Sequence, residues 1–241
     1  MKILLILPVL FILNACVSYD DHDTSKASGA YGLAKQLQKD ERYEEALLQY
    51  KDLKNRFPYS RYAVESELQI AEIQYAKEAF PEAQGAYQLF KELHPKHKRI
   101  DYVTFQIGES IYMQLPSTID RDLSVAPAAV TEYKVLLRDF PQSEYTKKAQ
   151  SRIKEIYQKL AEKELYIANF YYRTSKWQHA LVRYEKYLRT FPQHDQRPKA
   201  LLKAGYAAEK FGDASKRNVL FRKLIKDYPG SKEAKSAKGA L

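Results

Sequence analysis

A stripe of apolar residues that ends in a proline, present in five copies, is the feature that most constrains the fold of this chain. In residues 177–192, apolar side chains stand one, five, eight, twelve and fifteen positions before Pro192. Steps of three and four residues place them on one face of a helix, which the proline ends because its ring clashes with the preceding turn. The same spacing precedes four other prolines, Pro58, Pro95, Pro141 and Pro229. Only His94 and Arg217 interrupt it, so the pattern predicts a repeat protein.

The repeated unit resembles the second helix of a tetratricopeptide repeat, with an alanine and an aromatic residue at fixed distances before the proline. This resemblance implies a first helix with a small residue about 24 positions before the proline, where the two helices of a hairpin approach closely. Small residues stand there in four units, at Ala34, Ala71, Ala168 and Gly205. We therefore expect an all-α fold, a tetratricopeptide-repeat solenoid of five helical hairpins over about residues 30 to 230.

The charge and the polar residues of the chain argue against catalysis, metal binding and nucleic-acid binding. The net charge of +10 is spread over many helix faces, and no nucleic-acid-binding motif accompanies it. The five histidines lack the spacing of zinc ligands, and no phosphate-binding loop or nucleophile motif is present. We therefore expect no enzyme activity, no cofactor, no metal and no nucleic-acid partner. The acidic run at residues 20–23 is expected to be a solvated part of a tether.

The N-terminus has the pattern of a bacterial export signal. Lys2 precedes eleven apolar residues, 3–13, a stretch too short to span a bilayer. Residues 13–16, Leu-Asn-Ala-Cys, resemble the lipobox at which lipoprotein signals are cleaved. The resemblance implies a signal peptide at residues 1–15. An ordinary signal peptide with cleavage at another position is the alternative.

Cleavage at the lipobox would make Cys16 the first residue of the mature protein. The resemblance implies a diacylglycerol and an N-acyl chain, palmitate included, on Cys16, and several acyl chains anchor a protein stably. Residues 16–29 would then be a lipidated tether. Val17 and Ser18 follow the cysteine, and the absence of Asp there is similar to lipoproteins sorted to the outer membrane. We expect a lipid-anchored protein on the periplasmic face of the outer membrane of a Gram-negative cell.

Four local sequences narrow the class of repeat protein. The most distinctive is residues 93–103, which contain a His-Pro pair and an Asp-Tyr pair and precede Gly108. The others are residues 56–62, 120–122 and 160–172. Together with the lipobox they resemble the BamD family, the lipoproteins of the outer-membrane β-barrel assembly (BAM) machine.

That resemblance implies two partner-binding regions. In the family, C-terminal repeats hold the periplasmic POTRA domains of the barrel component, and N-terminal repeats receive the C-terminal signal of unfolded outer-membrane proteins. The corresponding regions here are residues 143–241, with repeats four and five and a capping tail, and residues 30–142, with repeats one to three. Arg183 matches the family's arginine at the POTRA contact, and Glu185 matches an acidic residue two positions later. Other accessory assembly lipoproteins are further expected partners.

The first helices of stacked hairpins line a concave groove that suits an extended or helical peptide. Six residues on the expected first helices are candidate groove residues: Tyr62, Glu65, Gln69, Glu72, Gln106 and Glu109. They are equally well explained as polar residues that face solvent.

The third unit is longer than the repeat, because 33 residues separate Gly108 from Pro141 where the unit needs 24, and we assign the surplus to residues 114–125. We expect them to form an inserted loop. Such a loop either carries partner contacts or is a tolerated bulge of the surface.

Serines that stand two positions after a proline are predicted helix N-caps; these are Ser60, Ser143 and Ser231. An unbroken helical pattern from about residue 143 to 174 predicts a long helix of about 48 Å. Residues 231–241 form either a short capping helix or a frayed end.

Two other classes of envelope protein remain as alternatives. A tetratricopeptide pilotin lipoprotein, which escorts a secretin to the outer membrane, has the same lipobox and repeats. An envelope enzyme such as a glycan hydrolase needs a carboxylate in a cleft, and no residue pattern marks one. The BamD-like segments favour a scaffold of the BAM machine that receives unfolded outer-membrane proteins for folding and insertion.

Overall fold

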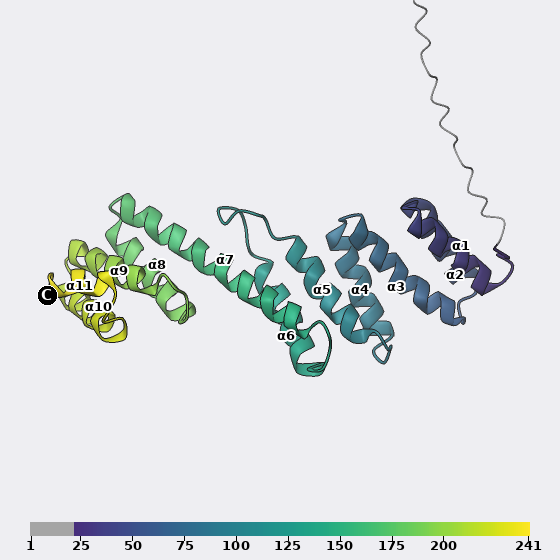
Figure 1. Cartoon of the computed structure of the whole chain (residues 1–241). Helices are drawn as coiled ribbons and strands as arrows, with labels where there is room; N and C mark the ends of the chain where they lie inside the picture. Colours follow the sequence, from purple (N-terminus) through teal and green to yellow (C-terminus); the bar gives the residue numbers. More distant parts are fainter. Residues whose placement is uncertain (1–21) are drawn as a thin grey trace, which may run out of the picture. The chain divides into compact units, whose positions relative to one another are not determined.

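The computed structural model describes residues 22–241, which contain eleven α-helices and no strand (Figure 1). The chain divides into two compact units, Met1–Lys77 and Glu78–Leu241, called unit 1 and unit 2. Unit 1 contains α1 (Ala27–Lys39), α2 (Tyr43–Arg56) and α3 (Arg61–Ala76). Unit 2 contains α4 (Phe80–Leu93), α5 (Ile100–Met113), α6 (Ala126–Asp139), α7 (Thr146–Arg173), α8 (Trp177–Thr190), α9 (Arg197–Phe211), α10 (Ala214–Asp227) and α11 (Lys232–Lys238).

The expected all-α repeat fold is confirmed for the described residues, since α1 to α10 follow the predicted order of first and second helices. The boundary between the units is a division by packing. It differs from the functional division expected between residues 142 and 143, which stays a prediction. The expected signal peptide at residues 1–15 and the expected lipidation site Cys16 lie outside the described residues. α1 begins at Ala27, inside the tether expected at 16–29.

In unit 1, α1 and α2 form a hairpin, and α3 packs against both helices. The three helices share one core, which includes Ala34, Leu37, Ala46, Tyr50 and Ile73. Ser60 begins α3 as predicted, because its hydroxyl accepts a hydrogen bond from the backbone N–H of Ala63 at 3.2 Å. This bond satisfies one of the free donors in the first turn of the helix.

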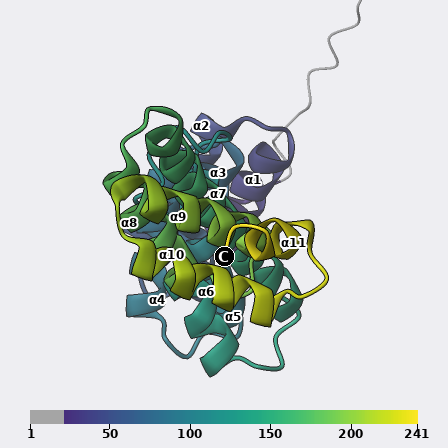
Figure 2. The ribbon, with the colours of Figure 1, turned by 90° about the vertical axis from the view of Figure 1, so that its left-hand side faces the viewer.

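In unit 2, each helix from α4 to α11 packs against the next one, and α11 also packs against α9 (Figure 2). α7 has 28 residues, whereas its neighbours α6 and α8 have 14 each. This confirms the predicted long helix, which packs against both α6 and α8. Figure 1 shows α6 near one end of α7 and α8 near the other.

The repeated sequence positions form the cores of both units. The residues eight positions before the five prolines are all fully buried: Tyr50, Tyr87, Tyr133, Tyr184 and Phe221. A first-helix small residue faces this position, since a methyl group at Gly205 would lie 2.1 Å from Cε1 of Phe221. No side chain fits between α9 and α10 there, which explains why the close approach of the two helices requires glycine.

The predicted N-cap at Ser143 is wrong. α7 begins at Thr146, and the Ser143 hydroxyl instead donates a hydrogen bond to the Asp101 carboxylate at 2.7 Å. Ser231, at the same place after its proline, does cap a helix by accepting a hydrogen bond from the N–H of Ala234 at 3.0 Å. Of the two alternatives for the tail, a short capping helix or a frayed end, the structure has the short helix, α11.

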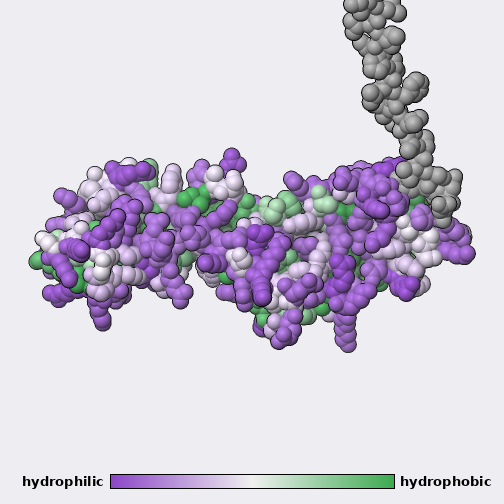
Figure 3. Space-filling view, in the orientation of Figure 1, coloured by the Kyte–Doolittle hydropathy of each residue, from purple (hydrophilic) through white to green (hydrophobic). Residues whose placement is uncertain are grey.

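The inserted loop at residues 114–125 lies between α5 and α6, outside any helix, as predicted. Among the described residues, no helix combines the length and the apolar character needed to cross a bilayer. Figure 3 shows one face of the molecule, where hydrophilic residues predominate and hydrophobic residues form small scattered areas.

Candidate partner-binding site

The predicted site residue Arg183 lies on α8 and points to α7. Its Nη1 donates a hydrogen bond to Oε1 of Glu164 at 3.0 Å, and Nζ of Lys186 lies 2.8 Å from Oε2 of the same carboxylate. The Glu164 side chain is only 10% exposed, whereas those of Arg183 and Lys186 are 36% and 49% exposed. One nearly buried carboxylate on α7 thus holds two cations, three positions apart on α8, at the surface.

Glu185, the second predicted partner-binding residue, faces a different neighbour. Its carboxylate accepts a hydrogen bond from Nζ of Lys216 on α10 at 2.8 Å. This hydrogen bond raises the pKa of Lys216 above its ordinary value of 10.5. Arg183 and Glu185 do not pair with each other, because residues two positions apart point to different sides of a helix.

A shallow cleft of about 420 Å³ surrounds Arg183 and Lys186. Tyr171 of α7 and His179 of α8 form one wall, with their rings stacked at a centroid distance of 5.3 Å. Val182 also lines this cleft, and 58% of its surface is exposed. We call this surface the Arg183 cleft. It combines cations with an apolar and aromatic wall, which suits a protein partner that offers a carboxylate beside an apolar side chain.

The inserted loop approaches the same arginine from another side. A second cleft, of about 400 Å³, is lined by Leu123 of the loop, by Glu164 and Ile167 of α7, and by Arg183. The loop is fastened to α7, because Lys159 Nζ donates a hydrogen bond to the carbonyl of Pro116 at 2.8 Å. Its apolar residue Leu123 is buried. The loop is therefore an ordered border of the candidate site.

The predicted groove residues of unit 1 lie on α3. Gln69 is 5% exposed and therefore offers no surface to a peptide. The other three, Tyr62, Glu65 and Glu72, are half-buried. The Tyr62 ring packs against Tyr31 at a centroid distance of 5.3 Å, and its hydroxyl accepts a hydrogen bond from Nη2 of Arg61 at 2.9 Å.

The predicted groove residues of unit 2 lie on α5. Gln106 is half-buried and donates a hydrogen bond to the Tyr102 hydroxyl at 2.8 Å. Glu109 is in the interior, with 2% of its side chain exposed, because it faces α6 and α7 rather than solvent. The expectation that Gln69 and Glu109 line an open groove is therefore corrected by their burial.

Glu109 is bound from three sides. Its carboxylate accepts hydrogen bonds from Nε of Arg152 at 2.9 Å and from the Tyr133 hydroxyl at 2.5 Å, and Lys148 Nζ lies 3.1 Å away. Burial raises the pKa of Glu109, but these hydrogen bonds outweigh it, and the pKa lies below the ordinary value of 4.5. The residue is charged and its role in this structure is to join α5, α6 and α7.

Two residues of these clusters, Glu164 and Arg152, were not predicted from the sequence. Both lie on α7 among many charged residues, and their partners are 19 and 43 positions away along the chain. Only the packing of α7 against its neighbours distinguishes these two residues from the other charged residues of the helix. Within residues 22–241, no three histidine, cysteine or acidic side chains come together in a way that would hold a metal ion.

Comparison with known proteins identifies relatives of this chain. The family model YfiO, described as an outer membrane lipoprotein, matches residues 23–219. The outer membrane protein assembly factor BamD of Neisseria meningitidis serogroup A is 25% identical over 246 residues, covering 95% of this chain and 92% of the relative. BamD of Vibrio cholerae is 27% identical over 158 residues, covering 62% of this chain and 66% of the relative.

Solved structures of tetratricopeptide proteins also align with the chain. The complex of the TPR2AB domain of yeast Sti1 with an Hsp90 peptide has a TM-score of 0.47 at 15% identity, covering 90% of this chain and 83% of that one. PilF of Pseudomonas aeruginosa has a TM-score of 0.38 at 15% identity, covering 91% of this chain and 84% of that one.

The family match begins just before α1 and ends within α10, so it takes in both units and the residues of the Arg183 cleft. The chain therefore belongs to the YfiO family of outer-membrane lipoproteins.

Proposed function

We propose that this chain is a component of the β-barrel assembly complex of the outer membrane, where it holds the barrel component and receives unfolded outer-membrane proteins for folding and insertion. The observation that carries this proposal is the family match over residues 23–219, joined by relatives named as outer membrane protein assembly factors. The chain acts by binding other polypeptides, so it needs no catalytic residue and no cofactor.

The proposed attachment is a lipid anchor on Cys16 at the periplasmic face of the outer membrane. The lipobox-like sequence at residues 13–16 supports it. Intact-mass measurement of the protein extracted from membranes should give a chain that starts at Cys16 and carries acyl groups. A Cys16→Ser variant should leave the membrane fraction.

The proposed contact for the POTRA domains of the barrel component is the Arg183 cleft. A guanidinium has five N–H donors, and Arg183 uses its Nη1 for Glu164. With its remaining donors it can bind a partner carboxylate in the two-pronged geometry that arginine favours. The exposed Val182 beside it supplies apolar contact area, so one arginine and its apolar neighbours form the centre of the interface.

The experiment is a binding measurement between the full-length protein and the POTRA domains of the barrel component. Arg183→Leu and Arg183→Glu should weaken binding by about 2 kcal/mol or more, which is roughly thirtyfold. The matched control is Arg222→Leu on α10, an exposed arginine outside the cleft, which should bind like the wild type. Unchanged affinity of the two Arg183 variants would reject this contact.

The N-terminal repeats are proposed to receive the C-terminal signals of unfolded outer-membrane proteins. Tyr62, Glu65 and Glu72 in unit 1 and Gln106 in unit 2 are the candidate residues that are not buried. Accessory assembly lipoproteins are the other proposed partners. Cross-linking from these positions to the C-terminal peptide of an outer-membrane protein tests the assignment.

A further inference from the structure

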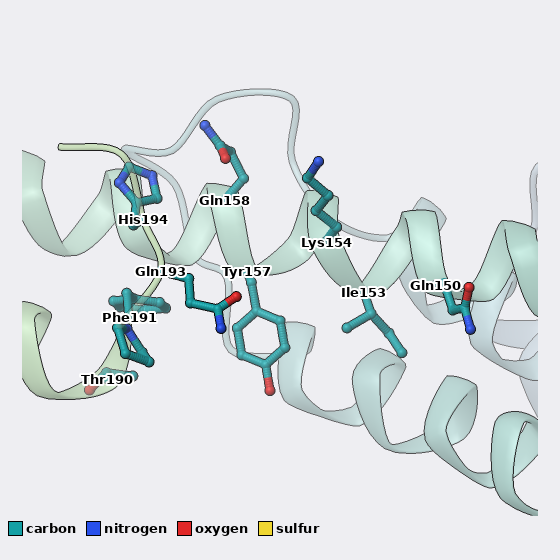
Figure 4. A pocket seen from close by; sticks show the side chains of 10 residues that line it. Gln150, Ile153, Lys154, Tyr157, Gln158, Thr190, Phe191, Gln193 and His194 are labelled. Carbon is teal, nitrogen blue, oxygen red and sulfur yellow. The ribbon is translucent and has the colours of Figure 1, made fainter. Parts of the chain in front are cut away.

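A third cleft in unit 2 lies between the first half of α7 and the turn that follows α8 (Figure 4). Its volume is about 600 Å³. The α7 side consists of Gln150, Ile153, Lys154, Tyr157 and Gln158, and the other side is the turn at residues 190–194. In Figure 4, the side chains of Ile153 and Tyr157 project from one side of α7, with Gln193 beside Tyr157, and those of Lys154 and Gln158 project from the other side. None of these residues lines the Arg183 cleft, and Thr190 and Phe191 are shared with the cleft beside the inserted loop.

The cleft exists because α7 is twice as long as α8. The five α7 residues recur at intervals of three and four positions and so form one face of the helix. α8 ends at Thr190, and Pro192 and the following turn lead the chain into α9. Within the described part of unit 2, this leaves Tyr157 with 40% of its surface exposed. The first half of α7 thus keeps an apolar strip that no following helix covers.

The far wall of the cleft is held in place by polar contacts of His194 and Arg197, whose side chains are largely buried. Nδ1 of His194 lies 2.8 Å from the Tyr187 hydroxyl and 3.1 Å from the Asp195 carboxylate. The buried Arg197 donates hydrogen bonds through Nη1 to the carbonyls of Leu188 at 2.6 Å and Phe191 at 3.0 Å. These bonds satisfy carbonyls at the end of α8 and place a positive charge at its negative end. The cleft is therefore preformed. Because Arg197 neutralises the partial negative charge of the carbonyls at the end of α8, these carbonyls do not give the cleft a negative potential.

The side chains of the cleft determine the chemistry of its occupant. Lys154 is the one lysine or arginine among the lining residues. These residues include no carboxylate, although the exposed Asp195 contacts the lining residue His194. Lys147 lies two turns earlier on the same face of α7 and is exposed. Gln150, Gln158 and Gln193 each carry an amide that both donates and accepts hydrogen bonds, as a peptide backbone requires. The Gln158 amide already donates one hydrogen bond, to Glu162 at 3.1 Å, and keeps its other N–H and its oxygen for a ligand. Ile153 and Tyr157 supply apolar area between them.

We propose that this cleft binds a segment of a partner polypeptide in which an apolar side chain is flanked by carboxylates. The apolar side chain packs on Ile153 and Tyr157, a carboxylate pairs with Lys154, and the glutamine amides bind the backbone of the segment. This site is separate from the proposed POTRA contact and does not depend on it.

The test uses the full-length protein and labelled synthetic peptides of about twelve residues, with binding followed by fluorescence anisotropy. One peptide alternates Asp and Glu with Leu and Phe; its counterpart keeps the Leu and Phe residues and replaces the acids by Lys. The acidic peptide should bind, and the basic one should not. Lys154→Glu and Tyr157→Ser should each weaken binding at least about tenfold. Both residues are exposed, so the far-UV circular dichroism spectra should stay unchanged.

Two control variants make the result specific. Lys134→Glu makes the same charge change at an exposed lysine of α6 that does not line the cleft, and should leave affinity within about twofold of the wild type. Arg183→Leu should also bind the acidic peptide normally, which separates this site from the Arg183 cleft. Equal binding of both peptides, no binding by the wild type, or equal weakening by Lys154→Glu and Lys134→Glu would each overturn the proposal.

Discussion

Unit 2 contains two carboxylates that each bind an arginine and a lysine, but the two arginines are used differently. Arg152 contacts Glu109 through Nε and Nη2 and donates from Nη1 to Glu155 at 3.0 Å. Its guanidinium also lies 4.2 Å from the centre of the Tyr112 ring. Arg183, by comparison, makes one hydrogen bond, to Glu164, within the described residues.

This comparison separates a structural arginine from one that is available to a partner. All three nitrogen atoms of the Arg152 guanidinium have protein acceptors, so it fastens α7 to α5. Arg183 is oriented by one bond and keeps donors for another molecule. The sequence contains many arginines on helices, and it is the number of bonds already made inside the protein that distinguishes these two.

The largest expected effect is on stability and comes from Arg152→Leu. This change leaves Glu109 buried with a lysine and a tyrosine as its remaining partners, which should lower the free energy of unfolding by about 3 kcal/mol. Urea denaturation followed by circular dichroism measures it, with Arg222→Leu as the control for loss of an exposed arginine. A loss below about 1 kcal/mol would mean that the bonds of Arg152 do not make it structural.

A smaller effect, with a defined pH dependence, is expected for Glu109→Gln. The folded state lowers the pKa of Glu109 below 4.5, so the charged carboxylate contributes stability that is fully present above this pH. That contribution is lost as the pH falls through the lowered pKa of the folded state. The free energy of unfolding of the wild type should exceed that of the variant by about 2 kcal/mol at pH 7. This difference should shrink as the pH falls below 4.5.

Urea denaturation of both proteins at a series of pH values checks this prediction. If the difference in the free energy of unfolding between the two proteins stays constant down to the lowest pH of the series, the charge of Glu109 is not the cause of the stabilisation. Glu155→Gln, a change at a more exposed carboxylate that also contacts Arg152, serves as a comparison and should have a smaller effect at neutral pH.

The smallest expected change in stability comes from Arg183→Leu. Lys186 still neutralises Glu164 in this variant, and both cations are more than a third exposed, so the loss should be no more than about 1 kcal/mol. The same urea experiment measures it. A loss as large as that of Arg152→Leu would make Arg183 structural as well, and the contrast between the two arginines would fail.

The helices of this protein are largely predictable from the sequence, because their burial follows a local period. The middle positions of the stripe before each proline are fully buried, such as Tyr133 and Tyr184, whereas its end positions, such as Phe57 and Trp177, are half-buried. The surplus over the repeat length predicted the loop at residues 114–125. Both inferences need only the distance between residues along one helix or one repeat.

The contacts of the charged residues could not be predicted in the same way. Glu109 has the spacing of a groove residue, but the packing of α7 onto α5 buries it against Arg152. Ser143 has the position of an N-cap, but its hydroxyl donates a hydrogen bond to the Asp101 side chain, and α7 begins later, at Thr146. In each case the deciding partner is about forty residues away in the chain, and a one-dimensional pattern does not contain that contact.

The measurement that tests the proposed role most directly is mass spectrometry of proteins cross-linked to the native, membrane-bound protein. We predict cross-links from lysines beside the Arg183 cleft, such as Lys186, to the POTRA domains of the barrel assembly component. Recovery of a secretin without any POTRA protein would contradict the account and would instead identify a pilotin.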